Sequence, residues 1–131
     1  KSSRLSQFLD NWLKRAEIFP EPPILNLKKL NPLLTGHDMC RAAREYDNCL
    51  DARIANVIAG TRFYYEWTDK PTAIVEVSND KPLGWRVSEI QARNNKRPPR
   101  STVKKIQTTF AAHGVSSQDS WRKNFIWFDI D

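Results

Sequence analysis

The sequence is poor in cysteine and histidine and has no long apolar run, and each scarcity excludes a class of protein. Two cysteines, Cys40 and Cys49, are too few for the disulfide framework of a small secreted domain. Two histidines, His37 and His113, without a Cys-x-x-Cys pair argue against a structural zinc site. No apolar run approaches the roughly 20 residues of a membrane-spanning helix. We therefore expect a cytoplasmic protein without a membrane partner and without a resident cofactor.

The remaining composition is typical of one globular domain. Of the 131 residues, 40% are hydrophobic, and five Trp, three Tyr and six Phe are enough to fill one core. The chain begins at Lys1 without a Met and stops at Asp131, directly after an apolar segment. Both ends are typical of a piece of a longer protein, so we expect other domains of that parent protein among the partners.

Positive charge is concentrated in one segment. The chain carries 21 basic and 15 acidic residues, a net charge of +6. Seven basic residues and one acidic residue lie between positions 86 and 105, which leaves 14 of each kind in the other 111 residues. A body without net charge that carries one basic segment predicts a localised site for anions.

The single domain, residues 1–131, divides into three parts. Residues 1–19 are predicted to form an amphipathic helix, because their apolar side chains repeat at helical spacing. Residues 20–37 are a Pro-rich connector, and residues 38–131 form the core of the domain. The apolar residues of the N-terminal helix are Leu5, Phe8, Leu9, Trp12, Leu13 and Ala16.

The core is predicted to begin with a helical region over residues 38–60. Asp38 is placed to cap its start, and Gly60 is placed to end it. Asn48 marks a break, so the region is either one helix or two shorter ones. The apolar positions that repeat at three and four are Met39, Ala42, Ala43, Tyr46, Cys49 or Leu50, Ile54, Val57 and Ile58.

Three strands are predicted next, over 62–67, 72–78 and 85–92, joined by hairpin-length turns. A helix capped by Ser101 and a last strand over 124–130 complete the core. The fold class is therefore α+β: an antiparallel three-strand meander flanked by helices, in the order helix, helix, three strands, helix, strand. The buried stripe of the last helix is predicted to be Val103, Ile106, Phe110 and Ala111.

The loop between the third strand and the last helix is the leading candidate for a nucleic-acid-binding site. Helix N-termini present free N–H groups to phosphates, and consecutive prolines stiffen the loop that holds the cations. Asparagine donates to phosphate or to a base edge. The pattern leaves DNA and RNA open. The candidate residues are Arg93, Asn94, Asn95, Lys96, Arg97, Arg100, Lys104 and Lys105.

Two carboxylates and an amide on neighbouring strands form a second candidate site. Glu76 lies on the 72–78 strand, and alternation places Trp85, Val87, Glu89 and Gln91 on one face of the next strand. Carboxylates on adjacent strands suit Mg²⁺, and this order of elements is also that of the PD-(D/E)XK nuclease core. The alternatives are a Mg-dependent nuclease and ordinary solvated or hydrogen-bonded strand residues.

Cys49 is the one nucleophile candidate. A thiolate at a helix beside a basic group is reactive, but free cysteine more often packs as a small buried hydrophobe. We predict the buried, structural role for Cys49, and no role for Cys40.

Several short motifs follow one another in the middle of the chain. The first motif is an Asn-Cys pair followed by an apolar residue, and after it comes a helix that ends at glycine. An aromatic-rich strand, a strand that contains Pro and Glu-Val, and a strand that ends in Gln and Asn then follow. The positions are Asn48-Cys49-Leu50, Gly60, Phe63-Tyr64-Tyr65, Pro71–Val77 and Gln91–Asn95.

These motifs resemble the PcfJ-like family of conjugative plasmids and other bacterial mobile elements, over about residues 30–98. The chain departs from the family pattern at Arg53, where Tyr is usual, and at Ala92-Arg93, where a Gly is frequent. The resemblance implies a mobile-element or anti-phage setting and supplies no biochemical activity. Besides nucleic-acid binding and nuclease activity, a third hypothesis is a protein-interaction domain whose N-terminal helix or Trp-rich tail docks on a larger assembly.

Overall fold

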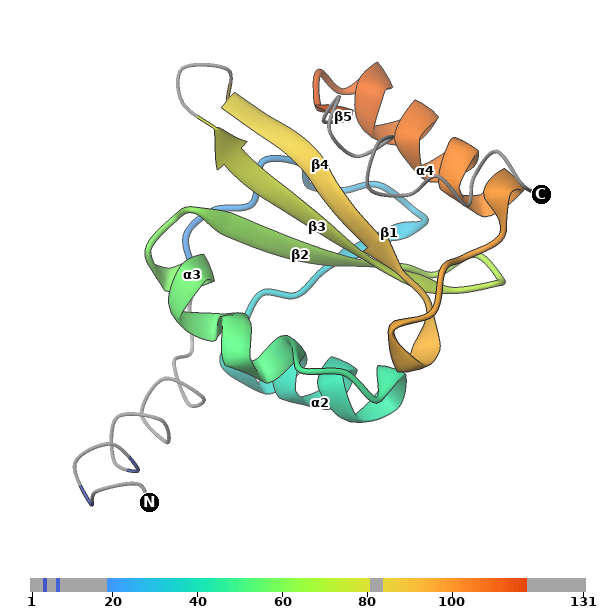
Figure 1. The fold of residues 1–131 in the computed structure, drawn as a ribbon. Coiled ribbons are helices and arrows are strands. Elements are labelled where there is room, and N and C mark those ends of the chain that lie inside the picture. Colours follow the sequence, from blue (N-terminus) through green and yellow to red (C-terminus); the bar gives the residue numbers. More distant parts are fainter. Residues whose placement is uncertain (1–3, 5–6, 8–18, 81–83, 118–131) are drawn as a thin grey trace.

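The computed structural model describes residue 4, residue 7 and the stretches 19–80 and 84–117. Over these residues the chain forms helices packed on a five-stranded, mostly antiparallel sheet, which is an α+β fold (Figure 1). The predicted fold class and the broad order of helices and strands are therefore confirmed. No helix within the described stretches is long and apolar enough to cross a membrane.

Two of the predicted elements cannot be compared with the structure. The helix predicted over 1–19 lies almost wholly outside the described residues, and the strand predicted over 124–130 lies wholly outside them. The Trp-rich tail of the interaction hypothesis lies there as well.

The strands follow one another in space as they do in sequence. Each neighbouring pair is antiparallel except the last, in which β5 runs parallel to β4 after a helical crossover. The predicted meander corresponds to the three central strands. The strands are β1 (Leu30–Pro32), β2 (Arg62–Trp67), β3 (Ala73–Asp80), β4 (Gly84–Gln91) and β5 (Ser116–Ser117).

The connector contributes a strand, β1, that was not predicted from the sequence. Leu30 pairs with Trp67, and the Leu33 N–H donates to the Tyr64 carbonyl at 3.0 Å. Pro32 is tolerated because β1 is an edge strand, where a missing N–H costs no ladder bond. The burial of Leu30 and Leu33 attaches the connector to the core.

The helical region after the connector is broken into α2 (Gly36–Tyr46), a 3₁₀ turn η1 (Leu50–Arg53) and α3 (Ile54–Ile58). The break predicted near Asn48 is therefore present. The predicted cap at Asp38 is wrong, because Thr35 caps α2 by accepting from the Asp38 N–H at 3.1 Å.

The last helix, α4 (Arg100–Ala112), begins two residues earlier than predicted. Its N-cap is Pro99 and no side chain caps it, so the predicted Ser101 cap is wrong. The physical reason is the Pro-Pro pair, which keeps the chain extended up to the residue where the helix begins. Of the predicted stripe, Val103, Ile106 and Phe110 are buried, whereas Ala111 is exposed.

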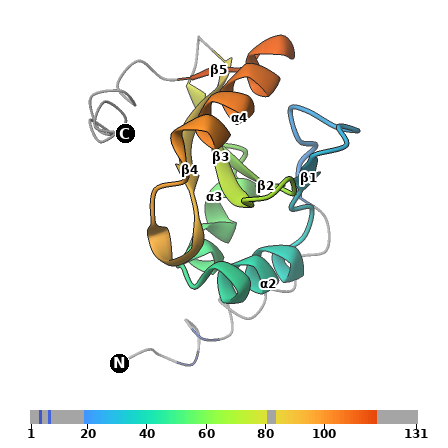
Figure 2. The same ribbon diagram turned by 90° about the vertical axis from the view of Figure 1, so that its right-hand side faces the viewer.

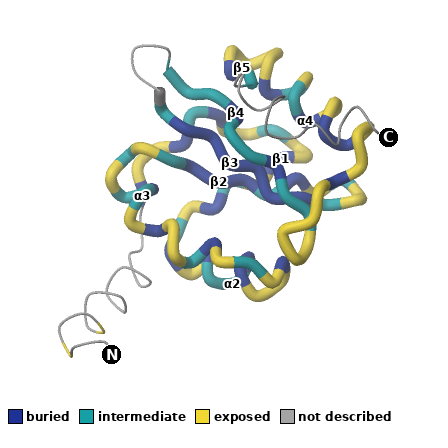
Figure 3. Tube along the Cα trace, viewed as in Figure 1, coloured by how far each residue is buried: buried dark blue, intermediate teal, exposed yellow. Residues whose placement is uncertain are grey.

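The sheet separates two helical layers. In both ribbon views α4 lies over one face of the sheet, and α2 and α3 lie over the other (Figures 1 and 2). The central strands β2 and β3 are the most buried part of the chain, β4 is mostly half-buried, and the loop that precedes α4 is largely exposed (Figure 3). The α4 face of β2–β4 carries eight buried hydrophobic residues: Phe63, Tyr65, Trp67, Ala73, Val75, Val77, Val87 and Ile90.

Candidate functional site

A pocket of about 60 Å³ opens on the α2 face of the sheet, between η1 and the central strands. It brings together four residues singled out in the sequence, Cys49, Glu76, Glu89 and Gln91. Asn95, from the basic loop, completes its rim. The full lining is Asn48, Cys49, Leu50, Arg53, Tyr64, Ile74, Glu76, Glu89, Gln91 and Asn95.

Glu76 is the most heavily bonded group in the pocket. One carboxylate oxygen, Oε2, accepts from the Tyr64 hydroxyl at 2.6 Å and from Arg53 Nη1 at 3.2 Å. The other, Oε1, accepts from the Ser88 hydroxyl at 2.6 Å. Arg62 Nε lies 3.8 Å from Oε2, and the Glu76 side chain is only 9% exposed. Of the two roles considered from the sequence, a metal ligand or a hydrogen-bonded strand residue, these contacts fit the second. The negative charge of Glu76 is balanced by arginine.

A β-bulge in β4 decides which residues face the pocket. Glu76 pairs with Glu89, but the next residue along β3, Val77, pairs with Val87, which leaves Ser88 as an extra residue. The predicted alignment of Val87 with Glu89 is therefore wrong, because the bulge breaks the alternation between them. Val87 joins the buried apolar face, whereas Ser88 and Glu89 turn toward Glu76.

Glu89 differs from its cross-strand partner in its surroundings. Gln91 Nε2 donates to Glu89 Oε2 at 2.9 Å, and Glu89 forms no salt bridge with any other residue that the structure describes. Burial, followed by the negative charge of Glu76, raises the pKa of the Glu89 carboxyl. The pocket thus contains one neutralised carboxylate, Glu76, and one that holds a proton more readily than an exposed glutamate.

Tyr64 acts as a permanent donor in this cluster. Burial, and then the charge of Glu76, raises the pKa of the Tyr64 hydroxyl well above its ordinary value of 10. The hydroxyl therefore keeps its proton at any physiological pH and donates to Glu76.

Three polar residues of the pocket, Asn48, Arg53 and Tyr64, were not among the site residues predicted from the sequence. Tyr64 could have been found from the register of the β2–β3 hairpin, because that register pairs it with Glu76. Asn48 Oδ1 accepts from the Leu50 N–H at 3.0 Å, so it starts the 3₁₀ turn and places Arg53 over the sheet. No sequence pattern connects Arg53 with Glu76, 23 residues away.

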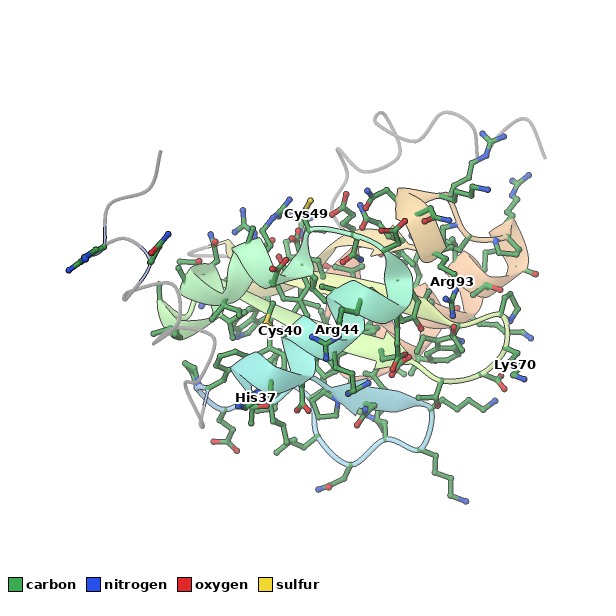
Figure 4. All side chains as sticks on the ribbon, turned by 90° about the horizontal axis from the view of Figure 1, so that it is seen from below. His37, Cys40, Arg44, Cys49, Lys70 and Arg93 are labelled. Atoms are coloured by element: carbon green, nitrogen blue, oxygen red, sulfur yellow. The ribbon has the colours of Figure 1, made fainter. Side chains whose placement is uncertain are left out.

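Cys49 is exposed, so the prediction that it is buried is wrong. Asp47 adopts a left-handed conformation (φ 49°) that ends α2, and the apolar repeat resumes at Leu50, which takes the core position. Viewed from below, the Cys49 sulfur points away from the body of the molecule (Figure 4). Neither cysteine forms a disulfide bond, and Cys40 packs against the core.

The basic loop forms a compact structure beside the pocket. Asn94 and Asn95 are both left-handed (φ 60° and 57°), a conformation that asparagine tolerates better than most residues. The loop is closed by hydrogen bonds from the Ala92 N–H to the Lys96 carbonyl (2.8 Å) and from the Lys96 N–H to the Arg93 carbonyl (3.2 Å). All eight predicted nucleic-acid-binding residues, from Arg93 to Lys105, are exposed.

Arg93 has a second contact. Its guanidinium lies 5.8 Å from the centre of the Tyr46 ring on α2, which is within cation–π range (Figure 4). This contact fixes one end of the loop against α2.

The described residues contain no group of three or more His, Cys, Asp or Glu side chains placed to hold a metal ion. Comparison of the chain with protein-family models, with curated proteins and with solved structures found no match.

Proposed function

We propose that the protein is a nucleic-acid-binding module that holds phosphates through the basic segment, residues 93–105. The observation that carries the proposal is the exposure of all six cations of this segment on one short, closed loop and the helix that follows it. The rest of the chain has no net charge, so the segment is the main source of positive potential.

The preformed shape of the basic segment supports this proposal. The two left-handed asparagines, the closing hydrogen bonds and the buried Pro98 hold the loop before any ligand binds. Binding then costs less conformational entropy than it would in a mobile loop. Lys104 and Lys105 extend the charge onto the first turns of α4.

The position of Arg100 also supports the proposal, because a cation there destabilises the helix that it begins. It is the first residue of α4, where a cation meets the positive end of the helix dipole. A residue that is unfavourable for the fold at its position, and exposed, is suited to an anionic partner.

The test is a salt titration of binding to single- and double-stranded DNA and RNA. Each lost phosphate contact lowers the slope of log K against log salt by about 0.7–0.9. Replacing Arg93, Arg97 and Arg100 together with Ala should therefore lower the slope by about two to three units and weaken all sequences alike.

The matched control removes three positive charges elsewhere, from Lys28, Lys29 and Arg41. These side chains precede the β2–β4 meander, and two of them form surface salt bridges of their own. Equal losses in the two triple variants would mean diffuse attraction, and the basic segment would not be the site. If neither variant binds less than the parent, the interaction-domain hypothesis takes its place.

A Mg-dependent nuclease is the second candidate, favoured by the cross-strand pairing of Glu76 with Glu89 beside Gln91 in one pocket. The residues present fit a cation poorly, however, because Arg53 already pairs with Glu76 at 3.2 Å. The candidate predicts Mg²⁺-dependent cleavage that Glu76→Gln abolishes while binding persists. A parent protein that binds nucleic acid and cleaves none in Mg²⁺ removes this candidate.

The biological setting that we propose comes from the PcfJ-like resemblance, which implies a bacterial mobile-element or anti-phage protein acting in the cytoplasm. The residues that carry the resemblance include eight that line the pocket: Asn48, Cys49, Leu50, Tyr64, Ile74, Glu76, Gln91 and Asn95. This gathering supports the view that the motifs mark one site.

A further inference from the structure

The pocket and the basic segment meet at Asn95 but differ in charge. The segment is cationic throughout, whereas the pocket contains two carboxylates and one guanidinium, that of Arg53. Arg53 forms its salt bridge with Glu76, and Glu89 forms no salt bridge with any described residue, so the charge of Arg53 offsets that of Glu89 only in part. A phosphate is attracted by the segment and repelled by Glu89.

The pocket offers hydrogen-bonding groups on its rim and apolar surface on its walls. Glu89 has lone pairs left after accepting from Gln91, and Asn48 and Asn95 add amide groups from two different loops. The side chains of Leu50 and Ile74 supply apolar contact. Flat polar molecules with donors along one edge suit such a site.

We propose that the pocket holds the Watson–Crick edge of an unpaired guanine whose neighbouring phosphates lie on the basic segment. This inference rests on the proposed function and names the part of the nucleic acid that the pocket selects. A nucleotide combines an anionic phosphate with an uncharged base, and the cationic segment beside the acidic pocket has the complementary arrangement.

Guanine fits better than the other bases because of Glu89. The edge of guanine presents two adjacent donors, N1–H and the N2 amino group, which match the two oxygens of one carboxylate. Adenine and cytosine present one donor group beside an acceptor, and that acceptor would face the charge of Glu89. A partner protein's arginine also has paired donors, but its positive charge would be repelled by the basic segment beside the pocket.

The size of the pocket limits how much of the base enters. A volume of about 60 Å³ admits one edge of a planar ring and leaves the rest outside. Unpaired bases are read in this way, by hydrogen bonds to an exposed edge and contact with the ring face. A duplex, whose Watson–Crick edges are already paired, is excluded from this contact.

The experiment measures affinity for single-stranded oligouridine that carries one central guanine, inosine or adenine. Inosine differs from guanosine only by the missing N2 amino group, so the comparison isolates one hydrogen-bond donor. We expect the parent protein to prefer guanine to inosine by about tenfold, within the range that one bidentate contact gives. Glu89→Gln should abolish this preference and leave the salt dependence of binding unchanged.

Glu66→Gln is the matched control. Glu66 lies on the same face of the sheet and accepts from the Tyr46 hydroxyl at 2.8 Å, but it does not line the pocket. It should keep the preference for guanine. The proposal is overturned if the parent binds guanine and inosine strands equally, or if the Glu66 and Glu89 variants lose the preference together.

Failure of all the oligonucleotides to bind would contradict the proposed function but would not test the pocket itself. A second measurement therefore tests the pocket without any phosphate. Cys49 belongs to the lining of the pocket and is exposed at its edge, so an occupant that fills the mouth of the pocket hinders the approach of a thiol reagent to Cys49. Guanosine, which has no phosphate, should slow the labelling of Cys49 more than inosine does. Shielding by methylguanidinium and not by guanosine would assign the pocket to an arginine side chain, and shielding by neither would show that it binds no such edge.

Discussion

The two faces of the sheet are built from alternate residues of the same strands, yet they differ in composition. Tyr65 and Val75, which are fully buried, lie on the α4 face, and Phe110 of α4 packs against the Tyr65 ring at 5.5 Å. On the α2 face, the cross-strand pairs next to them are Tyr64 with Glu76 and Glu76 with Glu89. The α4 face is closed by apolar contact, whereas the α2 face combines the buried apolar residues of its helices with hydrogen bonds around a pocket.

The difference separates stability from binding. Apolar burial contributes to stability in proportion to the area removed from water and needs no exact partner. A buried carboxylate costs free energy unless each of its oxygens is satisfied, so the Glu76 cluster has to be complete before the fold tolerates it. The α4 face therefore contributes to stability through apolar burial alone, whereas the α2 face adds a polar cluster to the buried apolar residues of α2, η1 and α3.

The largest effect is expected from breaking the apolar face. Phe110→Ala should lower the free energy of unfolding by about 3–5 kcal/mol, because it removes a fully buried ring and leaves a cavity. Urea denaturation measures this loss. The neighbouring exposed residue gives the control, and Ala111→Ser should change stability by less than about 1 kcal/mol. A small loss at Phe110 would mean that α4 is not a structural element of the core.

The second largest loss of stability is expected from a change in the hydrogen-bonded cluster around Glu76. Glu76→Gln keeps the shape but removes the charge that Arg53 pairs with and turns one acceptor into a donor. We expect a loss of about 1–3 kcal/mol in the free energy of unfolding. Glu66→Gln, on the same face, should cost less because its amide oxygen still accepts from Tyr46. Equal losses would show that the completeness of the Glu76 cluster is unimportant.

Glu89→Gln is expected to stabilise the protein at neutral pH. The folded pKa of Glu89 is raised above its ordinary value of 4.5, so the folded protein binds its proton more tightly than the unfolded chain does. The ionised Glu89 carboxylate therefore destabilises the folded state, and this destabilisation is complete at a pH above the folded pKa. It disappears as the pH falls below about 4.5, where the carboxyl is protonated in both states. Thermal melts of parent and variant across this range should converge in acid, and a pH-independent difference would contradict the assignment.

A smaller gain is expected at the start of α4. Arg100→Ala should stabilise the fold by about 0.3–1 kcal/mol at low salt, because it removes a cation from the positive end of the helix dipole. The same change should weaken nucleic-acid binding, whereas Arg100→Lys should leave both properties close to those of the parent. A loss of stability in the Ala variant would mean that Arg100 has a structural role.

The smallest effect is expected at Cys49. Cys49→Ser should change the free energy of unfolding by less than about 0.5 kcal/mol, because the side chain is exposed. A thiol reagent should label Cys49 in the native protein faster than Cys40, which packs against the core. Mass spectrometry of the two cysteine peptides measures the ratio, and faster labelling of Cys40 would place Cys49 inside the fold.

Much of the fold was predictable because periodicity reports burial. The strands over 62–67 and 72–78 and the buried residues Val103, Ile106 and Phe110 all follow from the spacing of apolar side chains. The β1 strand was not predictable, because three residues that include a proline carry no period. Helix caps were also missed, since Thr35 and Pro99 compete with equally plausible neighbours.

The candidate site was predictable in part. Glu76, Glu89 and Gln91 were identified as a group, and the fold places them in one pocket. Arg53 was not identified with them, because its pairing with Glu76 depends on how η1 lies over the sheet. The exposure of Cys49 was missed for a local reason, the left-handed Asp47 that shifts the apolar repeat by one residue.

The amino-acid sequence by itself determined the α+β class, the apolar face of the sheet and the concentration of charge between residues 86 and 105, because each depends on spacing or composition along the chain. Only the tertiary structure decided that Arg53 neutralises Glu76, that Ser88 bulges out and turns Glu89 into the pocket, and that Asn95 joins this pocket to the basic segment. These contacts join residues far apart in sequence, and their energies depend on distances and burial that exist only in the folded chain.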